Sequence, residues 1–145
     1  MGPLDLEKQL PRGPRETLAG LYFMPRTIDK LRAEQPGGKL GGYLNRPDGL
    51  SAYMCRRIGI DMEELRAKVA AAKDEAEIEG WLRERLDPAL VEEVNGKLAA
   101  LGTHKLTPEN LEQVKHYHPI LDERPELTRF FDIFEADEAP ARASR

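Results

Sequence analysis

The sequence has 145 residues, which is room for one domain and excludes a large multi-domain enzyme. Hydrophobic residues make up 40% of the chain and charged residues 33%, a composition typical of a soluble protein with a modest core. Residues 1–60 hold 10 Lys/Arg and 6 Asp/Glu, whereas residues 61–145 hold 12 Lys/Arg and 20 Asp/Glu. The mildly positive first part suits an anionic small molecule or an acidic partner better than duplex DNA.

The start of the chain predicts an extended arm followed by helix. Residues 1–15 contain three prolines and isolated leucines, which favours an N-terminal arm that packs over the core. From Glu16 the apolar spacing of Leu18, Leu21 and Tyr22 is helical. Pro25 interrupts that pattern and predicts a kink or a new helix start, which places Arg26 in a first turn.

A long loop separates this helix from the next. Residues 36–49 contain five glycines and two prolines, which predicts a loop of functional length. The apolar face from Leu50 to Ile58 predicts a helix ended by Gly59. Asp61 is then the expected cap of the following helix, with Glu64 completing a capping box.

Further start signals predict the remaining helices. Asp74, Asp87-Pro88 and Thr107-Pro108 each precede an apolar stripe. The last apolar face contains Leu127, Phe130, Phe131 and Phe134, and the polar end after Glu135 is expected to fray. No segment alternates convincingly with period 2. The sequence therefore predicts an all-α fold of about six or seven short helices, with one domain over residues 16–135, the arm at 1–15 and a polar tail at 136–145.

The densest charge cluster lies around the proline break. On a helix, Arg26 and Lys30 are i,i+4 neighbours, and Asp29 lies three residues from both Arg26 and Arg32. Arg offers a bidentate fork for a carboxylate or phosphate, Lys a mobile charge, and Asp a base or an orienting partner. We therefore interpret Arg26, Asp29, Lys30 and Tyr22 as candidate catalytic residues. A solvated helix face with weak surface ion pairs is the alternative.

Several segments resemble a known family. The best match is the run GLYFMPRTIDKLRA, which carries a motif of Pro, Arg, Asp, Lys, Arg and Ala. Further matches are Gly41-Gly42-Tyr43, Arg57-Ile58-Gly59-Ile60-Asp61, Trp81-Leu82 and FFDIFEADE. Together they resemble a bacterial family catalogued as domain of unknown function 5069. That resemblance implies a small α-helical protein and no particular activity.

Other motifs support weaker hypotheses. His116 and His118 could ligate a metal only if the helix ends between them, so we assign no metal site and interpret them as helix-end and loop side chains. The stretch from Leu50 to Lys68 has the rhythm of a helix-turn-helix, but Glu63 and Glu64 would face the duplex. Cys55 is interpreted as a core thiol, with a reactive thiol as the alternative.

The leading hypothesis is a cofactor-independent protein that binds an anionic metabolite and turns it over by acid–base chemistry of the lyase, isomerase or hydrolase type. Arg26 would anchor the anion, Lys30 would stabilise negative charge, and Tyr22 or Tyr43 would donate a proton. Arg32, Tyr43 and Arg46 are the candidate substrate-binding residues.

The second hypothesis is a regulatory or adaptor module that docks on another protein through its acidic or aromatic helices. The third hypothesis is a DNA-binding helix-turn-helix protein. The single cysteine and the lack of a signal-like or membrane-spanning apolar run favour the cytoplasm, without membrane association. No cofactor is expected, because the glycine-rich Gly37–Gly42 lacks the pattern of a nucleotide loop.

Overall fold

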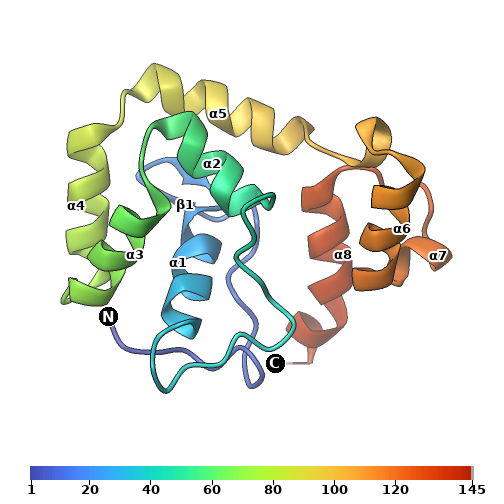
Figure 1. Ribbon diagram of the computed structural model, residues 1–145, viewed down its shortest axis with the longest axis horizontal. Helices are drawn as coiled ribbons and strands as arrows, with labels where there is room; N and C mark the ends of the chain where they lie inside the picture. Colours follow the sequence, from blue (N-terminus) through green and yellow to red (C-terminus); the bar gives the residue numbers. More distant parts are fainter. Residues whose placement is uncertain (145) are drawn as a thin grey trace. The chain divides into compact units, whose positions relative to one another are not determined.

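The computed structural model describes residues 1–144, and their contacts divide the chain into two compact units, Met1–Leu98 and Ala99–Arg145. The first unit contains β1 (Thr17–Leu18), β2 (Leu21–Tyr22), α1 (Met24–Ala33), α2 (Leu50–Ile58), α3 (Met62–Ala71), α4 (Glu75–Arg85) and most of α5 (Pro88–Ala100) (Figure 1). The second contains the 3-10 turn η1 (Thr103–Lys105), α6 (Pro108–Tyr117), α7 (Ile120–Glu123) and α8 (Phe130–Ala143). The single domain predicted for residues 16–135 stays a prediction.

The all-α class is confirmed. Residues 1–144 form eight α-helices, and their only sheet is the pair of two-residue strands β1 and β2. The four-residue helix α7 accounts for the excess over the six or seven helices expected. Within this described range, no helix combines the length and the apolar character needed to cross a membrane.

The helix predicted from Glu16 is wrong, because residues 17–22 form an antiparallel hairpin. Thr17 pairs with Tyr22 and Leu18 with Leu21. Ala19 and Gly20 make the turn at φ values of 53° and 78°, the pair of left-handed residues that a tight two-residue hairpin requires. Leu18 and Leu21 are both buried. Their spacing of three residues fits one face of a helix, but it also fits two residues that pair with each other across a two-residue turn, as they do here.

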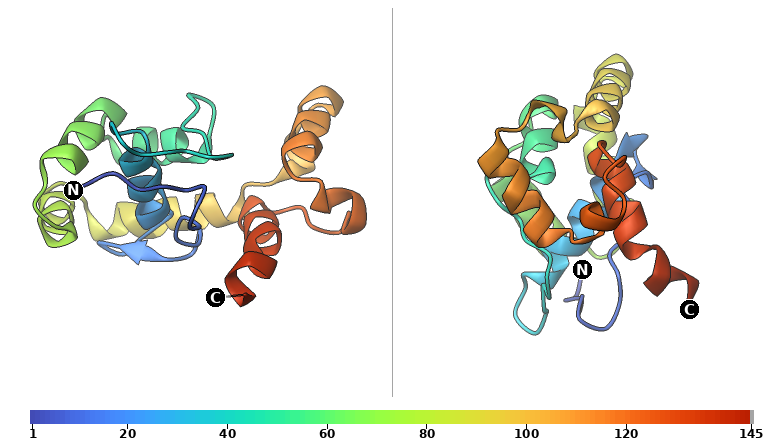
Figure 2. Two further views of the ribbon diagram at one scale, coloured as in Figure 1. Left: turned by 90° about the horizontal axis from the view of Figure 1, so that it is seen from below. Right: turned by 90° about the vertical axis from the view of Figure 1, so that its right-hand side faces the viewer.

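A side chain of α5 holds this hairpin. The Tyr22 N–H donates to Asn95 Oδ1 at 2.9 Å, and Asn95 Nδ2 donates to the Gly20 carbonyl oxygen at 2.8 Å. The left view in Figure 2 shows the hairpin running beside α5. One amide thus satisfies a donor and an acceptor that the two-residue strands leave unpaired.

The predicted helix starts are largely confirmed. Asp61, Asp74 and Thr107 cap α3, α4 and α6, and each side chain accepts a backbone N–H of the first turn. Gly59 ends α2 at φ 72°, as its position after the apolar face predicts. The N–H that Asp61 accepts is that of Glu63.

The core of the first unit forms around α1, which packs against α3 and β1. Figure 1 shows α1 beside α3. The largest fully buried side chains of this unit are Leu21, Phe23, Met24, Ile28, Leu31, Met54, Leu65, Ile78, Leu82 and Leu98. Their burial is the main favourable contribution to folding of this unit.

In the second unit α8 is longer than predicted. The expected frayed tail after Glu135 is wrong, because α8 continues to Ala143 with Pro140 inside it. Arg142 donates to Glu138 one turn earlier at 2.8 Å, which stabilises this last part of the helix. Phe131 and Ile133 are fully buried on α8, and α7 packs against the same helix.

Asn95→Ala removes both hydrogen bonds to the hairpin. We expect a loss of about 1–2 kcal/mol in the free energy of unfolding, since two backbone groups lose their partner. Urea denaturation followed by circular dichroism measures this loss. Asn110→Ala on the exposed part of α6 is the matched control and should change stability by less than about 0.5 kcal/mol.

Candidate functional site

Helix α1 is buried on its polar face as well as its apolar face. Arg26, Asp29 and Lys30 are 4%, 5% and 8% exposed, although charged side chains are rarely buried unless they are paired. These residues do lie on a helix with the predicted i,i+3 and i,i+4 spacing, but other parts of the chain cover that face of the helix. The alternative interpretation of this cluster as a solvated helix face is therefore wrong.

The N-terminal arm and the long loop cover this polar face. The Leu6 N–H donates to the Lys39 carbonyl at 2.8 Å, and the Lys39 N–H donates to the Leu4 carbonyl at 2.9 Å. Leu6, Pro11 and Pro14 are buried. The predicted packing of the arm over the core is confirmed at these residues, and it brings Arg12 against α1.

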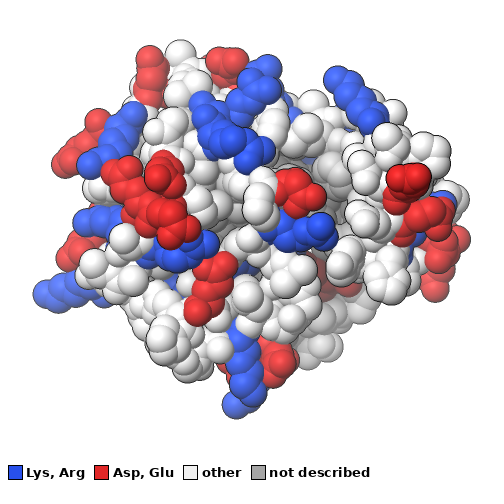
Figure 3. Space-filling view, in the orientation of Figure 1, with Lys and Arg blue, Asp and Glu red and all other residues white. Residues whose placement is uncertain are grey.

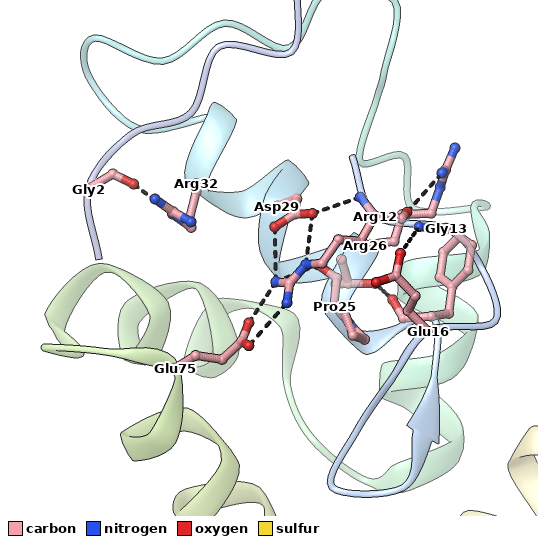
Figure 4. A network of polar contacts seen from close by, with 11 residues as sticks. Gly2, Arg12, Gly13, Glu16, Pro25, Arg26, Asp29, Arg32 and Glu75 are labelled. Atoms are coloured by element: carbon pink, nitrogen blue, oxygen red, sulfur yellow. Dashed lines mark hydrogen bonds and ion pairs between the residues drawn. The ribbon is translucent and has the colours of Figure 1, made fainter. Parts of the chain in front are cut away.

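Arg12 forms the central ion pairs of the site (Figure 4). Asp29 accepts three hydrogen bonds from Arg12, from the backbone N–H at 2.8 Å, from Nε at 3.1 Å and from Nη2 at 3.0 Å. Glu75 on α4 accepts from Nη1 at 3.0 Å and from Nη2 at 2.6 Å. These three residues, which we call the clamp, join the arm, α1 and α4 through paired carboxylates on one guanidinium.

The electrostatics of the clamp favour the charged form of Arg12. Burial alone would lower the pKa of Arg12, but the hydrogen bonds and the negative charges of Glu75 and Asp29 outweigh burial and raise it above its ordinary value. The guanidinium therefore keeps its charge at any pH at which the protein is folded.

The clamp also positions Arg26. Arg26 Nη1 donates to the Arg12 carbonyl oxygen at 3.1 Å. The Arg26 guanidinium lies 5.4 Å from the centre of the Tyr43 ring and 5.8 Å from that of Phe23. Both distances are within the range of a cation–π contact, so aromatic faces and a fixed carbonyl orient this cation.

Lys30 lies one turn further along the same face. Its Nζ donates to the Leu44 carbonyl oxygen at 3.3 Å and lies 5.5 Å from the centre of the Phe23 ring. Phe23 is therefore in contact with both cations. We call Arg26 and Lys30 the cation row.

The backbone that carries this ring is strained. Phe23 is the N-cap of α1 and has φ 70°, a left-handed value that is a true outlier for a bulky residue. Its N–H donates to Pro14 and its carbonyl accepts from the Thr27 N–H, so both backbone groups are fixed. Strain of this kind persists only where the surroundings impose it, and it is concentrated at functional sites.

The other candidate residues lie differently. Tyr43 joins Arg26, as the prediction of a shared site requires. Arg32 Nε donates to the Gly2 carbonyl oxygen at 2.8 Å, and Arg46 is exposed and pairs with Asp48 at 3.3 Å. Tyr22 lies in β2, where its backbone N–H is bonded to Asn95.

The structure adds Arg12, Phe23 and Glu75 to the predicted set. Arg12 had a faint sequence signal, since it stands between a proline and a glycine in an arm otherwise poor in structure. Glu75 had none, because it is one of several acidic residues at a helix start and lies 63 positions from Arg12. Phe23 had only its place beside the proline break.

The structure also places the residues on which the weaker hypotheses depend. Glu63 and Glu64 are exposed in the first turn of α3, which is where a recognition helix would meet DNA. His118 Nδ1 pairs with Asp137 of α8, and His116 is exposed. Residues 1–144 bring no three metal-binding side chains together.

The chain is a small all-α protein in which one buried helix carries a row of positioned cations. The model of a family described as a domain of unknown function (DUF5069) matches residues 8–140, so the chain belongs to that family. The matched range includes both the clamp and the cation row. No curated protein shows significant similarity to the chain.

Arg12→Met leaves the Asp29 carboxylate buried without its partner. We expect a loss of about 3 kcal/mol in the free energy of unfolding, because an uncompensated buried charge is costly. Urea denaturation measures the loss. Arg83→Met is the control, since the Arg83–Glu79 pair is exposed and contributes less than about 1 kcal/mol. Equal losses in the two variants would contradict the clamp.

Cys55 is buried in α2, and burial together with the charge of Asp61 raises the pKa of its thiol to about 11. The thiolate is the nucleophile, so at pH 8 the folded protein should react with iodoacetamide at least about 100-fold more slowly than the protein in urea. Mass spectrometry measures the rate. Rapid alkylation of the folded protein would support the reactive-thiol alternative.

Proposed function

We propose that the protein binds an anionic small molecule, a carboxylate or a phosphate, at the cation row of α1. The observation that carries this proposal is the burial of Arg26 and Lys30 on successive turns, with both side chains against the Phe23 ring. Cations held inside a protein interact more strongly with an anion than cations in water do.

The clamp supports binding because it fixes one of these cations in advance. Arg26 donates to the Arg12 carbonyl, and the Arg12 side chain is in turn held by Asp29 and Glu75. A side chain that is already ordered loses less conformational entropy when a ligand binds. A planar guanidinium oriented in this way suits the two oxygens of a carboxylate or phosphate.

Turnover of the ligand would be cofactor-independent acid–base chemistry of the lyase, isomerase or hydrolase type. Lys30 would stabilise developing negative charge and the Tyr43 hydroxyl would donate a proton. Asp29 accepts three hydrogen bonds from Arg12, which favours the role of positioning residue over that of base. Tyr22, Arg32 and Arg46 stay candidates for contacts with a larger ligand.

A protein-docking role is the second candidate, and the exposed aromatic residue of α6 favours it. Tyr117 is 53% exposed, and tyrosine is enriched where proteins meet. The face drawn in Figure 3 intersperses Lys/Arg with Asp/Glu side chains, so charge of one sign does not select a partner there. A stoichiometric partner recovered from extract, and lost with Tyr117→Ala, would support docking.

The cytoplasm is the proposed location. Cys55 is a free thiol in the core, and a protein with one unpaired cysteine suits a reducing compartment. Fractionation of cells that express the full chain tests this assignment.

Thermal shift against a panel of carboxylates and phosphates tests the binding function. A ligand at 100 times its dissociation constant adds about 2.7 kcal/mol of stability, which raises the melting temperature by several degrees. In Arg26→Met we expect at least about tenfold weaker binding of the same ligand, a difference of about 1.4 kcal/mol. Arg83→Met should bind as wild type does.

The proposal is wrong if every ligand that stabilises wild type stabilises Arg26→Met equally. If Arg26→Met fails to fold, Tyr43→Leu provides the same test, because it removes the ring that faces the guanidinium and leaves the helix unchanged.

A further inference from the structure

The loop segment Tyr43–Asn45 runs along the polar face of α1, and we call it the strap. Each of its residues contacts a different turn of the helix. The Tyr43 ring faces Arg26 at 5.4 Å, the Leu44 carbonyl accepts from Lys30 Nζ at 3.3 Å, and Asn45 Nδ2 donates to Glu34 Oε1 at 2.7 Å. Three consecutive loop residues thus contact residues 26 and 30 of α1 and its C-cap residue, Glu34.

The spacing of these contacts shows that long side chains make the attachment. Residues four apart on a helix share one face and are separated by about 6 Å along the axis, whereas consecutive residues of an extended chain advance about 3.3 Å. The Arg26 and Lys30 side chains span the difference. The two residues of the cation row are therefore also the residues that hold the strap.

The ends of the loop are fixed while its middle is attached by these contacts. Lys39 forms backbone hydrogen bonds with Leu4 and Leu6 in the arm. The Gly49 N–H donates to the Arg46 carbonyl at 3.0 Å just before α2 begins. Gly41 has φ 62°, a left-handed value that glycine adopts without strain, and a second glycine, Gly42, follows it just before the strap.

In its closed position the strap leaves one polar atom without a hydrogen bond. Among the described residues, Asn45 Oδ1 is buried without a hydrogen-bond partner. Its amide nitrogen is bonded to Glu34, whose other oxygen accepts from Arg66 Nε at 2.8 Å. A buried acceptor without a donor costs free energy, and opening would return it to water. Opening the strap therefore regains part of the free energy that the loss of its contacts costs.

We propose that the strap is a displaceable cover of the cation row, and that an anion which binds Lys30 displaces the Leu44 carbonyl and opens it. This inference rests on the proposed function. Its physical basis is competition for one ammonium group, since a carboxylate or phosphate oxygen adds the attraction of opposite charges to the hydrogen bond, whereas the carbonyl oxygen carries no net charge. Ligand entry and movement of the loop are then one event.

A nitroxide label on Leu44→Cys measures this movement. The Leu44 side chain is 48% exposed, and the substitution keeps the backbone carbonyl that accepts from Lys30. Cys55 is buried and its raised pKa suppresses its reaction, so the label attaches at position 44. Unsubstituted protein treated with the same reagent shows whether Cys55 is labelled. Electron paramagnetic resonance then reports the mobile and immobile fractions of the label.

We expect a mainly immobile label in the full chain without added anion. Lys30→Met should increase the mobile fraction at least about threefold, whereas Lys39→Met should not. Lys39 is the matched control because it lies in the same loop and pairs with Glu7 at the surface, at 3.4 Å. Inorganic phosphate and citrate are the probes. At least one of them should increase the mobile fraction of the label in the Lys39→Met protein. Neither should increase that fraction in the Lys30→Met protein, where the ammonium group for which the anion competes is absent.

Two results would overturn the inference. A label that is equally mobile with Lys30 or Met at position 30 shows that the cation does not hold the strap. A label that neither phosphate nor citrate mobilises shows that anions do not displace it. Either failure leaves the proposed function standing if Arg26→Met still weakens ligand binding in thermal shift, because that measurement does not depend on loop movement.

Discussion

The rest of the structure depends on one partly buried ion pair, that of Arg12 with Asp29. A helix with charged residues on one face would normally leave that face in water. Here the N-terminal arm covers it, and this is tolerable only because the Arg12 guanidinium neutralises the Asp29 carboxylate and reaches Glu75 on α4. The same contacts bring the Arg12 carbonyl to Arg26, so the ion pair that stabilises the fold also orients a cation.

The cation row follows from this burial. Once the arm and the loop lie over α1, Arg26 and Lys30 extend between aromatic rings and backbone carbonyls. Phe23 provides the ring that both cations share, at the cost of a left-handed backbone. A fold that needed only a stable helix start would not require a strained aromatic residue there. Stability and the proposed anion site therefore compete at the first residues of α1.

The sequence predicted the parts of this arrangement that local chemistry determines. Pro25 marked the start of α1, Asp61 and Asp74 marked caps, and the glycines after Pro36 marked the loop, because each acts on its own neighbours. The hairpin was missed since the leucine spacing suits helix and turn alike. The Arg12–Glu75 pair could not be predicted, because nothing local distinguishes Glu75 from other acidic residues at helix starts. The cations were predicted, but their burial was not.

A double-mutant cycle on Arg12 and Asp29 tests this account most directly. The free energy of unfolding is measured by urea denaturation for wild type, Arg12→Met, Asp29→Ala and the double variant. The account predicts a coupling energy of at least about 2 kcal/mol, because each side chain loses its main partner when the other is removed. A coupling energy within about 0.5 kcal/mol of zero would show that the two residues act independently, and would contradict the claim that this pair organises α1 and its cations.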